Sequence, residues 1–148
     1  MKPGPLATIT FLGVCVGLTA CGPLRKSNGA KTPDGVSFER GGVILTGSAL
    51  EDGSGSILST ISGKVPNFKV QRQSGRCPQI TLRSHVRFEA GMNPQVYVDG
   101  TRSTDTCILE TLQAGDVDRV EVYPQGFTTR PGYASHADGL ILVFMRSS

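Results

Sequence analysis

Three residues near the end of the chain have the types found in a hydrolase triad, namely Ser135, His136 and Asp138. Such a triad needs its nucleophile, its base and its orienting carboxylate to converge in space through defined hydrogen bonds. Neighbours within a single loop rarely achieve that convergence. We therefore expect a polar loop that leads into the last strand, without a catalytic role.

Three residues with carboxylates, Asp116, Asp118 and Glu121, lie close together in the sequence. Calcium would need more oxygen ligands on one loop, and Asp118 and Glu121 should point to opposite faces of a strand. Asp99-Gly100 is a turn dipeptide and is not expected to supply a catalytic acid. Phosphate-loop, dinucleotide and zinc patterns are absent from the sequence. The sequence thus predicts no enzyme, no metal site and no cofactor.

Cys21 lies where covalent lipidation is expected. Lys2 supplies a positive start, and the apolar stretch over residues 6–18 has signal-peptide length, below the ~20 residues that span a bilayer. The tetrad Leu18-Thr19-Ala20-Cys21 resembles the lipobox of bacterial lipoproteins, in which the cysteine is acylated and the preceding residues are removed. The alternative is a buried N-terminal strand or helix. We expect a signal peptide over residues 1–20.

Residues 21–42 are rich in glycine, serine, proline and charged residues, with little apolar periodicity, and this is typical of a flexible tether. Gly22 follows the cysteine where an aspartate would favour the inner membrane, so resemblance to enterobacterial sorting favours the outer membrane. An acylated Cys21 with two or more chains would hold the protein there durably. Basic tether residues could contact anionic headgroups, although a solvated linker is the simpler interpretation.

Cys77 and Cys107 remain after Cys15 leaves with the leader and Cys21 is lipidated. In an exported protein, two remaining cysteines most simply form a disulfide. A metal or redox pair and two free thiols are the alternatives. The spacing is not that of a CxxC motif, and no second cluster of cysteine or histidine accompanies the pair.

The chain carries 15 basic and 12 acidic residues, so its charge is nearly balanced. It contains no run of lysine or arginine and no basic segment interleaved with aromatic residues. We therefore expect no nucleic-acid partner.

Residues 43–148 form the remaining segment, which is long enough for one domain. Two short helices are predicted. The first has Ser54 or Ser56 as its N-cap, an apolar face of Ile57, Leu58 and Ile61, and Gly63 as its stop. The second is capped by Asp105 and runs to residue 112. Strands are predicted at 43–46, 68–72, 80–83, 96–98, 117–123 and 140–145. The continuous apolar run of the last strand indicates a central strand covered on both faces. The fold class is α+β, with a small mixed sheet.

Five segments form an ordered set of motifs between residues 57 and 146: Val65-Pro66-Asn67-Phe68-Lys69-Val70, Pro78-Gln79-Ile80-Thr81-Leu82-Arg83, Pro94-Gln95-Val96-Tyr97-Val98-Asp99-Gly100, a stretch over residues 112–122, and a closing stretch over residues 132–143. In order and spacing they resemble the plug domain of TonB-dependent outer-membrane receptors. The resemblance implies a plug-like fold, a location in the cell envelope, and loops that contact partners or ligands.

The sequence also departs from that pattern. The chain ends at Ser148, three residues after the last predicted strand, so we expect no barrel. The tether shows no convincing TonB-contact box. Ser84 and Asp138 replace the usual glycine and asparagine, and the cysteine pair is additional. Transport itself is therefore not carried over by the resemblance.

The loop over residues 125–136 is the expected interaction surface. Phe127, Arg130 and Tyr133 are of types favoured at binding hot spots. The alternative is a connecting loop whose Tyr133 packs on the sheet.

These observations predict a non-enzymatic, lipid-anchored binding module of the envelope, at the periplasmic side of the outer membrane. Its partner would be the membrane through Cys21 and an outer-membrane or periplasmic protein, or the peptidoglycan. The alternative is an accessory lipoprotein that binds a small ligand during outer-membrane nutrient uptake.

Overall fold

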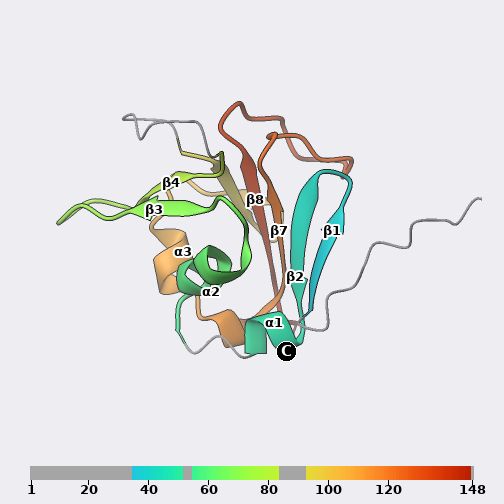
Figure 1. The fold of residues 1–148 in the computed structure, drawn as a ribbon, viewed down its shortest axis with the longest axis horizontal. Helices are drawn as coiled ribbons and strands as arrows, with labels where there is room; N and C mark the ends of the chain where they lie inside the picture. The colour runs from blue at the N-terminus through green and yellow to red at the C-terminus, as the bar shows by residue number, and fades with distance from the viewer. Residues whose placement is uncertain (1–34, 52–54, 84–92, 148) are drawn as a thin grey trace, which may run out of the picture.

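The structure is a computed structural model that describes residues 35–51, 55–83 and 93–147. A six-stranded mixed sheet has the strand order β1-β2-β7-β8-β5-β6, and a separate two-stranded sheet pairs β3 with β4 (Figure 1). β5 runs parallel to β8, and the other paired strands are antiparallel. The strands are β1 Val36–Glu39, β2 Gly42–Thr46, β3 Lys69–Gln71, β4 Gln79–Thr81, β5 Gln95–Val98, β6 Thr101–Arg102, β7 Val117–Tyr123 and β8 Leu140–Met145.

Short helices complete the fold: α1 Ser48–Glu51, α2 Ile57–Lys64, α3 Ile108–Thr111 and the 3-10 turn η1 Ala114–Asp116. The α+β class with a small mixed sheet is confirmed. α2 and α3 lie where the two helices were predicted, but α2 continues through Gly63, its predicted stop, to Lys64, and α3 is shorter than predicted. α1 is an additional single turn. The predicted cap of α3 is wrong: the N-cap residue is Cys107, without a side-chain cap, and the Asp105 carboxylate instead accepts a hydrogen bond from the backbone N–H of Cys107 in the turn before the helix.

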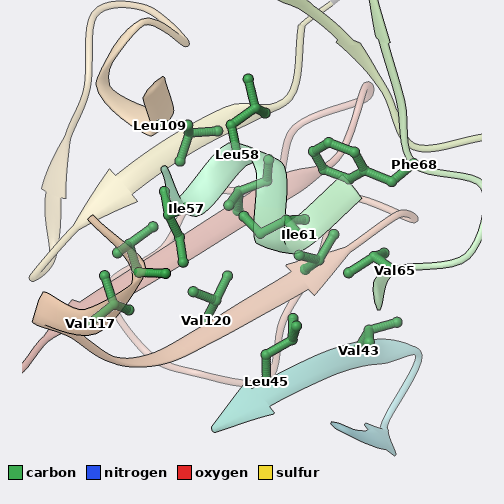
Figure 2. Packing of buried hydrophobic residues seen from close by; sticks show 14 of the residues in the cluster. Val43, Leu45, Ile57, Leu58, Ile61, Val65, Phe68, Leu109, Val117 and Val120 are labelled. Carbon is green, nitrogen blue, oxygen red and sulfur yellow. The ribbon is translucent and has the colours of Figure 1, made fainter. Parts of the chain in front are cut away.

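One face of the large sheet carries the main core. In α2, Ile57, Leu58 and Ile61 are fully buried. Figure 2 shows the side chains of this helix on one side of the core and those of Leu45 in β2 and Val120 in β7 on the other. The spacing of these three residues puts them on one helix face, so a single short helix can cover the middle of the sheet.

The other face of the sheet is covered by the loop over residues 124–139. Tyr97, Tyr123, Leu140 and Leu142 are buried on this face, and Tyr133 from the loop packs against them. In β8, residues 140–143 are all buried and alternate between the two faces. The prediction of a central strand covered on both sides is therefore confirmed.

Two tight turns reverse the chain at the sheet. Arg40 and Gly41 connect β1 to β2, and Asp99 and Gly100 connect β5 to β6, all with positive φ. Two-residue turns with positive φ at both positions match the twist of the strands they join. The carboxylate of Asp99 also accepts a hydrogen bond from the backbone N–H of Met145 at 2.9 Å, so this residue has the predicted turn position.

β1 corrects the predicted tether. Residues 36–42 were expected to be the end of a flexible segment, but residues 36–41 form this strand and its turn, and Gly42 begins β2. Phe38 pairs with Val43 of β2. The short Val36-Ser37-Phe38-Glu39 alternation is stabilised by pairing with β2, a contact that its own composition does not reveal.

The predicted signal peptide, the predicted lipidation site Cys21 and the predicted tether up to residue 34 lie outside the described residues, as do Ser54 and Ser84. Within the described ranges, no helix has both the length and the apolar character needed to cross a membrane.

Candidate functional site

The loop over residues 124–139 is closed at its base by two glycines. The N–H of His136 donates to the carbonyl of Gly126 at 2.8 Å, and a side chain on Gly126, with φ at +75°, would overlap the carbonyl oxygen of His136. Gly139, with φ at +109°, packs against the Leu82 side chain, 2.5 Å from where a Cβ would lie. Glycine is therefore needed at both positions for the two ends of the loop to approach each other.

An ion pair between a buried carboxylate and a partly exposed guanidinium fixes the middle of this loop to the sheet. Glu121 lies in β7 with a side chain that is 0% exposed, and the guanidinium of Arg130 reaches it from the loop. Arg130 Nε donates to Glu121 Oε2 at 2.7 Å, and Arg130 Nη2 donates to Glu121 Oε1 at 2.6 Å. This two-pronged arrangement restricts the orientation of the guanidinium as well as its distance.

Two further side chains complete this cluster. The Tyr123 hydroxyl donates to Glu121 Oε2 at 2.8 Å, and Arg119 Nε lies 3.1 Å from Glu121 Oε1 but makes no hydrogen bond to any described residue. Both guanidinium groups lie over the ring of Phe144, at 4.6 and 5.3 Å from its centroid. Two cations against one carboxylate leave an excess of positive charge, which the face of the ring helps to stabilise.

The electrostatics of the cluster shift two pKa values. Burial raises the pKa of Tyr123 above its usual value of 10.0, and the carboxylate of Glu121 adds to the shift. The same carboxylate raises the pKa of Arg130. Below the raised pKa of Tyr123, its hydroxyl remains a donor to Glu121.

The three residues predicted on the interaction loop have different environments. Arg130 is occupied by Glu121, and Tyr133 packs edge-on against Tyr97, with ring centroids 5.0 Å apart. Phe127 is 59% exposed. Tyr133 thus packs on the sheet, as in the alternative interpretation of this loop. Phe127 is exposed on a loop that Arg130 and Tyr133 attach to the sheet.

A hollow of about 590 Å³ lies next to this loop, at the β1–β2 turn. Phe38, Val43 and Leu82 provide much of its apolar lining, and the side chains of Arg40 and Arg83 line it too. Phe38 is 54% exposed, so its ring adds apolar surface beside the hollow.

The loop and the turn are joined directly. Arg40 Nη1 donates to the Thr129 hydroxyl at 3.2 Å, although the two residues are 89 positions apart. Figure 1 shows the β7–β8 loop reaching over to the turn between β1 and β2. We call the surface formed by this hollow and Phe127 the turn-end surface, and it is the candidate binding site.

The Ser-His-Asp residues do not converge as a triad. The N–H of Asp138 donates to His136 Nδ1 at 3.4 Å, while the carboxylate of Asp138 lies 3.9 Å from the same nitrogen. Within the described residues no hydrogen bond joins Ser135 to His136. Nucleophilic catalysis of the triad type needs such a contact, or one that forms when substrate binds.

Asp116 and Asp118 are exposed, whereas Glu121 points inward, so the predicted placement of Asp118 and Glu121 on opposite sides of β7 is confirmed. The carboxylate of Glu121 is occupied by Arg130 and Tyr123. These three carboxylates therefore do not share a metal site.

Cys77 and Cys107 are joined by a disulfide, with Asp105 nearby. In the disulfide, the two sulfurs cannot act as thiolate ligands of a metal ion. Of this group, only the carboxylate of Asp105 then remains as a possible ligand. The bond ties the segment before β4 to the start of α3, where the Thr106 hydroxyl also donates to the carbonyl of Pro78 at 2.6 Å.

Two features of this region of the molecule were not predicted from the sequence. Phe38 and Arg40 lay within the predicted tether, although the Gly41-Gly42 pair after them was a signal for a turn. Glu121 was considered only as a metal ligand. A charged residue flanked by Val120 and Val122 in an alternating strand was a signal for a buried ion pair.

Comparison with known proteins shows a likeness in fold. Neither known protein families nor curated proteins give a match to the sequence. The chain is similar to part of a chain in the structure of the RagAB peptide importer in the closed-closed state, with a TM-score of 0.54 and 18% identity over 78% of this chain. In the open-open state the TM-score is 0.54, with 16% identity over 74%.

The matched region is only 12% and 13% of the two solved chains, so this chain is similar to a small part of them. At this level of identity the likeness concerns the fold alone.

Proposed function

We propose that this protein is a lipid-anchored envelope protein whose plug-like domain acts as a non-enzymatic binding module at the outer membrane. One observation carries the proposal: 78% of the chain shares its fold with 12% of an importer chain. The five plug-like motifs of the sequence fall within the same domain. A domain of this fold, with a surface loop attached to its sheet through Arg130 and Glu121, is suited to contact a partner.

The turn-end surface supports a binding role. Phe127 is exposed on a loop that Glu121 and Arg130 hold in place, so its presentation costs little ordering on binding. An exposed aromatic on a fixed support has the properties of an interface anchor.

Lipid anchoring is tested by fractionation. A Cys21→Ala variant should move from the membrane fraction to the soluble periplasmic fraction, whereas Cys15→Ala should leave the distribution unchanged. If Cys21→Ala remained with the membranes, the anchor would be wrong.

The binding role is tested by affinity purification of the full chain from detergent-solubilised envelopes. We expect an outer-membrane importer or barrel protein to be enriched, and expect Phe127→Ser to reduce that enrichment. Identical protein sets with and without Phe127 would contradict a role for this surface.

The hollow favours a second candidate, an accessory protein that binds a small ligand during nutrient uptake, because its volume lies in the range of ligand pockets. Native mass spectrometry of the full chain should then show a co-purifying ligand. An apo mass, together with no thermal shift across a nutrient panel, would exclude this candidate.

A further inference from the structure

At the outer edge of β1, the backbone groups of Phe38 face away from the sheet. β1 pairs with β2 alone among the described strands, and so it forms one edge of the six-stranded sheet. The N–H of Thr46 donates to the carbonyl of Gly35 at 2.9 Å, so these two residues form a hydrogen-bonded pair. Hydrogen-bonded and non-hydrogen-bonded pairs then alternate along β1 and β2. By that alternation Phe38 opposes Val43 in a pair without mutual hydrogen bonds, so its N–H and C=O point away from β2.

These two backbone groups have no partner in the described part of the chain. An exposed strand edge of this kind is a template for a further strand.

The hollow lies on the side of the hairpin to which Phe38 points. Phe38 opposes Val43, a core residue, and both side chains line the hollow together with Leu82. Alternate side chains of a strand added to β1 would fall on this same face. One apolar side chain of that strand could therefore occupy the hollow beside Phe38.

The charges around the hollow indicate what such a strand would carry. Arg40 donates to the Thr129 hydroxyl and Arg83 Nε donates to the carbonyl of Pro124, so both guanidinium groups have neutral partners. No described carboxylate lies within 4 Å of either cation. Glu39 is the acidic residue of the lining, which leaves one positive charge in excess.

We propose that the β1 edge and the adjoining hollow bind an extended acidic peptide segment of a partner as an added strand. The segment pairs with the backbone of Phe38, inserts an apolar side chain into the hollow, and places carboxylates near Arg40 and Arg83. The proposal rests on the proposed function and names the chemistry that its binding surface recognises.

The positive charge around the hollow disfavours two other candidates for the added strand, namely the segment of this chain before β1 and a second copy of the chain. Residues 22–34 of this chain carry three basic residues and one acidic residue. A second copy would add another hollow whose lining has the same excess of one positive charge. An acidic segment from a different protein is the complementary partner.

The test measures binding of a fluorescent, capped hexapeptide to the full chain in detergent micelles. Its central valine has a glutamate two residues away on each side, with serine elsewhere, so that the valine and both glutamates share one face of an added strand. We expect saturable binding of the acidic peptide. The affinity should be at least about tenfold lower for a peptide with lysine in place of glutamate, and for a peptide N-methylated at alternate residues, which cannot pair as a strand. Equal binding of the N-methylated peptide, or no binding of the acidic one, would overturn the proposal.

A matched pair of variants isolates the backbone contact. Phe38→Ala and Phe38→Pro both remove the ring, but the proline also removes the outward N–H and leaves the β1–β2 hydrogen bonds intact. We expect Phe38→Pro to bind about fivefold more weakly than Phe38→Ala, with similar melting temperatures. Equal affinities of two folded variants would contradict strand addition.

Two more measurements separate the alternatives. Arg40→Glu should reduce the preference for the acidic peptide, while Arg40→Gln should reduce it less. A concentration-dependent dimer that Phe38→Pro abolishes would replace the peptide with a second copy and overturn the proposal. Failure of peptide binding with continued enrichment of an envelope protein would reject this inference alone, whereas loss of that enrichment would reject the proposed function.

Discussion

At the scale of single residues, Glu121 determines how the second face of the sheet is covered. Its carboxylate is buried in β7, and it is compensated by Arg130, Tyr123 and the nearby Arg119. A buried carboxylate is costly unless it is paired and hydrogen-bonded. The same contacts that compensate it also attach the loop over residues 124–139.

Removal of Arg130 should therefore destabilise the domain. Arg130→Ala leaves Glu121 with Arg119 and Tyr123, and we expect the free energy of unfolding to fall by about 2–4 kcal/mol. Urea unfolding followed by circular dichroism measures the loss. Arg72→Ala is the matched control, because Arg72 pairs with Glu110 on the surface and should cost only ~0–1 kcal/mol. Similar losses in the free energy of unfolding for the two variants would contradict a larger contribution from the ion pair at the buried Glu121 carboxylate.

Tyr123 makes a separate contribution that depends on pH. Its hydroxyl donates to a charged acceptor, so Tyr123→Phe should cost about 1.5–3 kcal/mol at pH 8. Burial raises the pKa of Tyr123 above 10.0 in the folded state. Its protonated form therefore stabilises the fold fully below pH 10.0, and this contribution is lost as the pH rises through the raised value.

Unfolding free energies of the wild type and Tyr123→Phe, measured from pH 8 upward, should show a difference that shrinks above pH 10.0. A difference that is independent of pH would contradict the role given to this hydroxyl.

At the scale of elements, glycines set the shape of the loop. Gly126→Ala combines a strained positive φ with an overlap against the carbonyl of His136, and we expect it to cost about 3 kcal/mol or more. Gly132→Ala is the control, because φ is also positive there but a Cβ would meet nothing within 4 Å, so only about 1–2 kcal/mol is expected. Thermal unfolding compares the two. Equal effects would mean that the loop base is not closed as described.

The disulfide acts between elements as well. It joins the segment before β4 to the start of α3 across a separation of 30 residues. In the chain-entropy account, opening a loop of that size costs ~3–4 kcal/mol, so a Cys77→Ala, Cys107→Ala double variant should unfold at lower urea concentration. Intact mass spectrometry without reductant checks the bond directly, since a pair of free thiols would be heavier by two hydrogen atoms.

The elements also show how far the sequence leads. β8 and α2 were predictable because an apolar run and an i, i+1, i+4 spacing are local signals. β1 was not, since a four-residue edge strand among polar residues depends on pairing with β2. For the same reason the hollow could not be predicted, because Phe38 and Leu82 meet only in the folded sheet. Phe127 was found from its residue type, whereas the binding of Arg130 to Glu121 required the register of β7.

At the scale of the whole molecule, the fold separates support from recognition. Helices and the β3–β4 sheet cover one face of the large sheet, and the loop over residues 124–139 covers the other (Figure 1). The turn-end surface lies where that loop meets the β1–β2 turn. In the proposed function, an acylated Cys21 holds the domain at the membrane, and this surface contacts the partner.

Photocrosslinking in living cells tests this account most directly. A photoreactive amino acid at Phe127, within the full chain, should crosslink to one outer-membrane protein identified by mass spectrometry. The same group at Gln71, which is exposed on β3, should give no such product. Crosslinks that are equal at the two positions, or absent from Phe127, would contradict a binding module that acts through the turn-end surface.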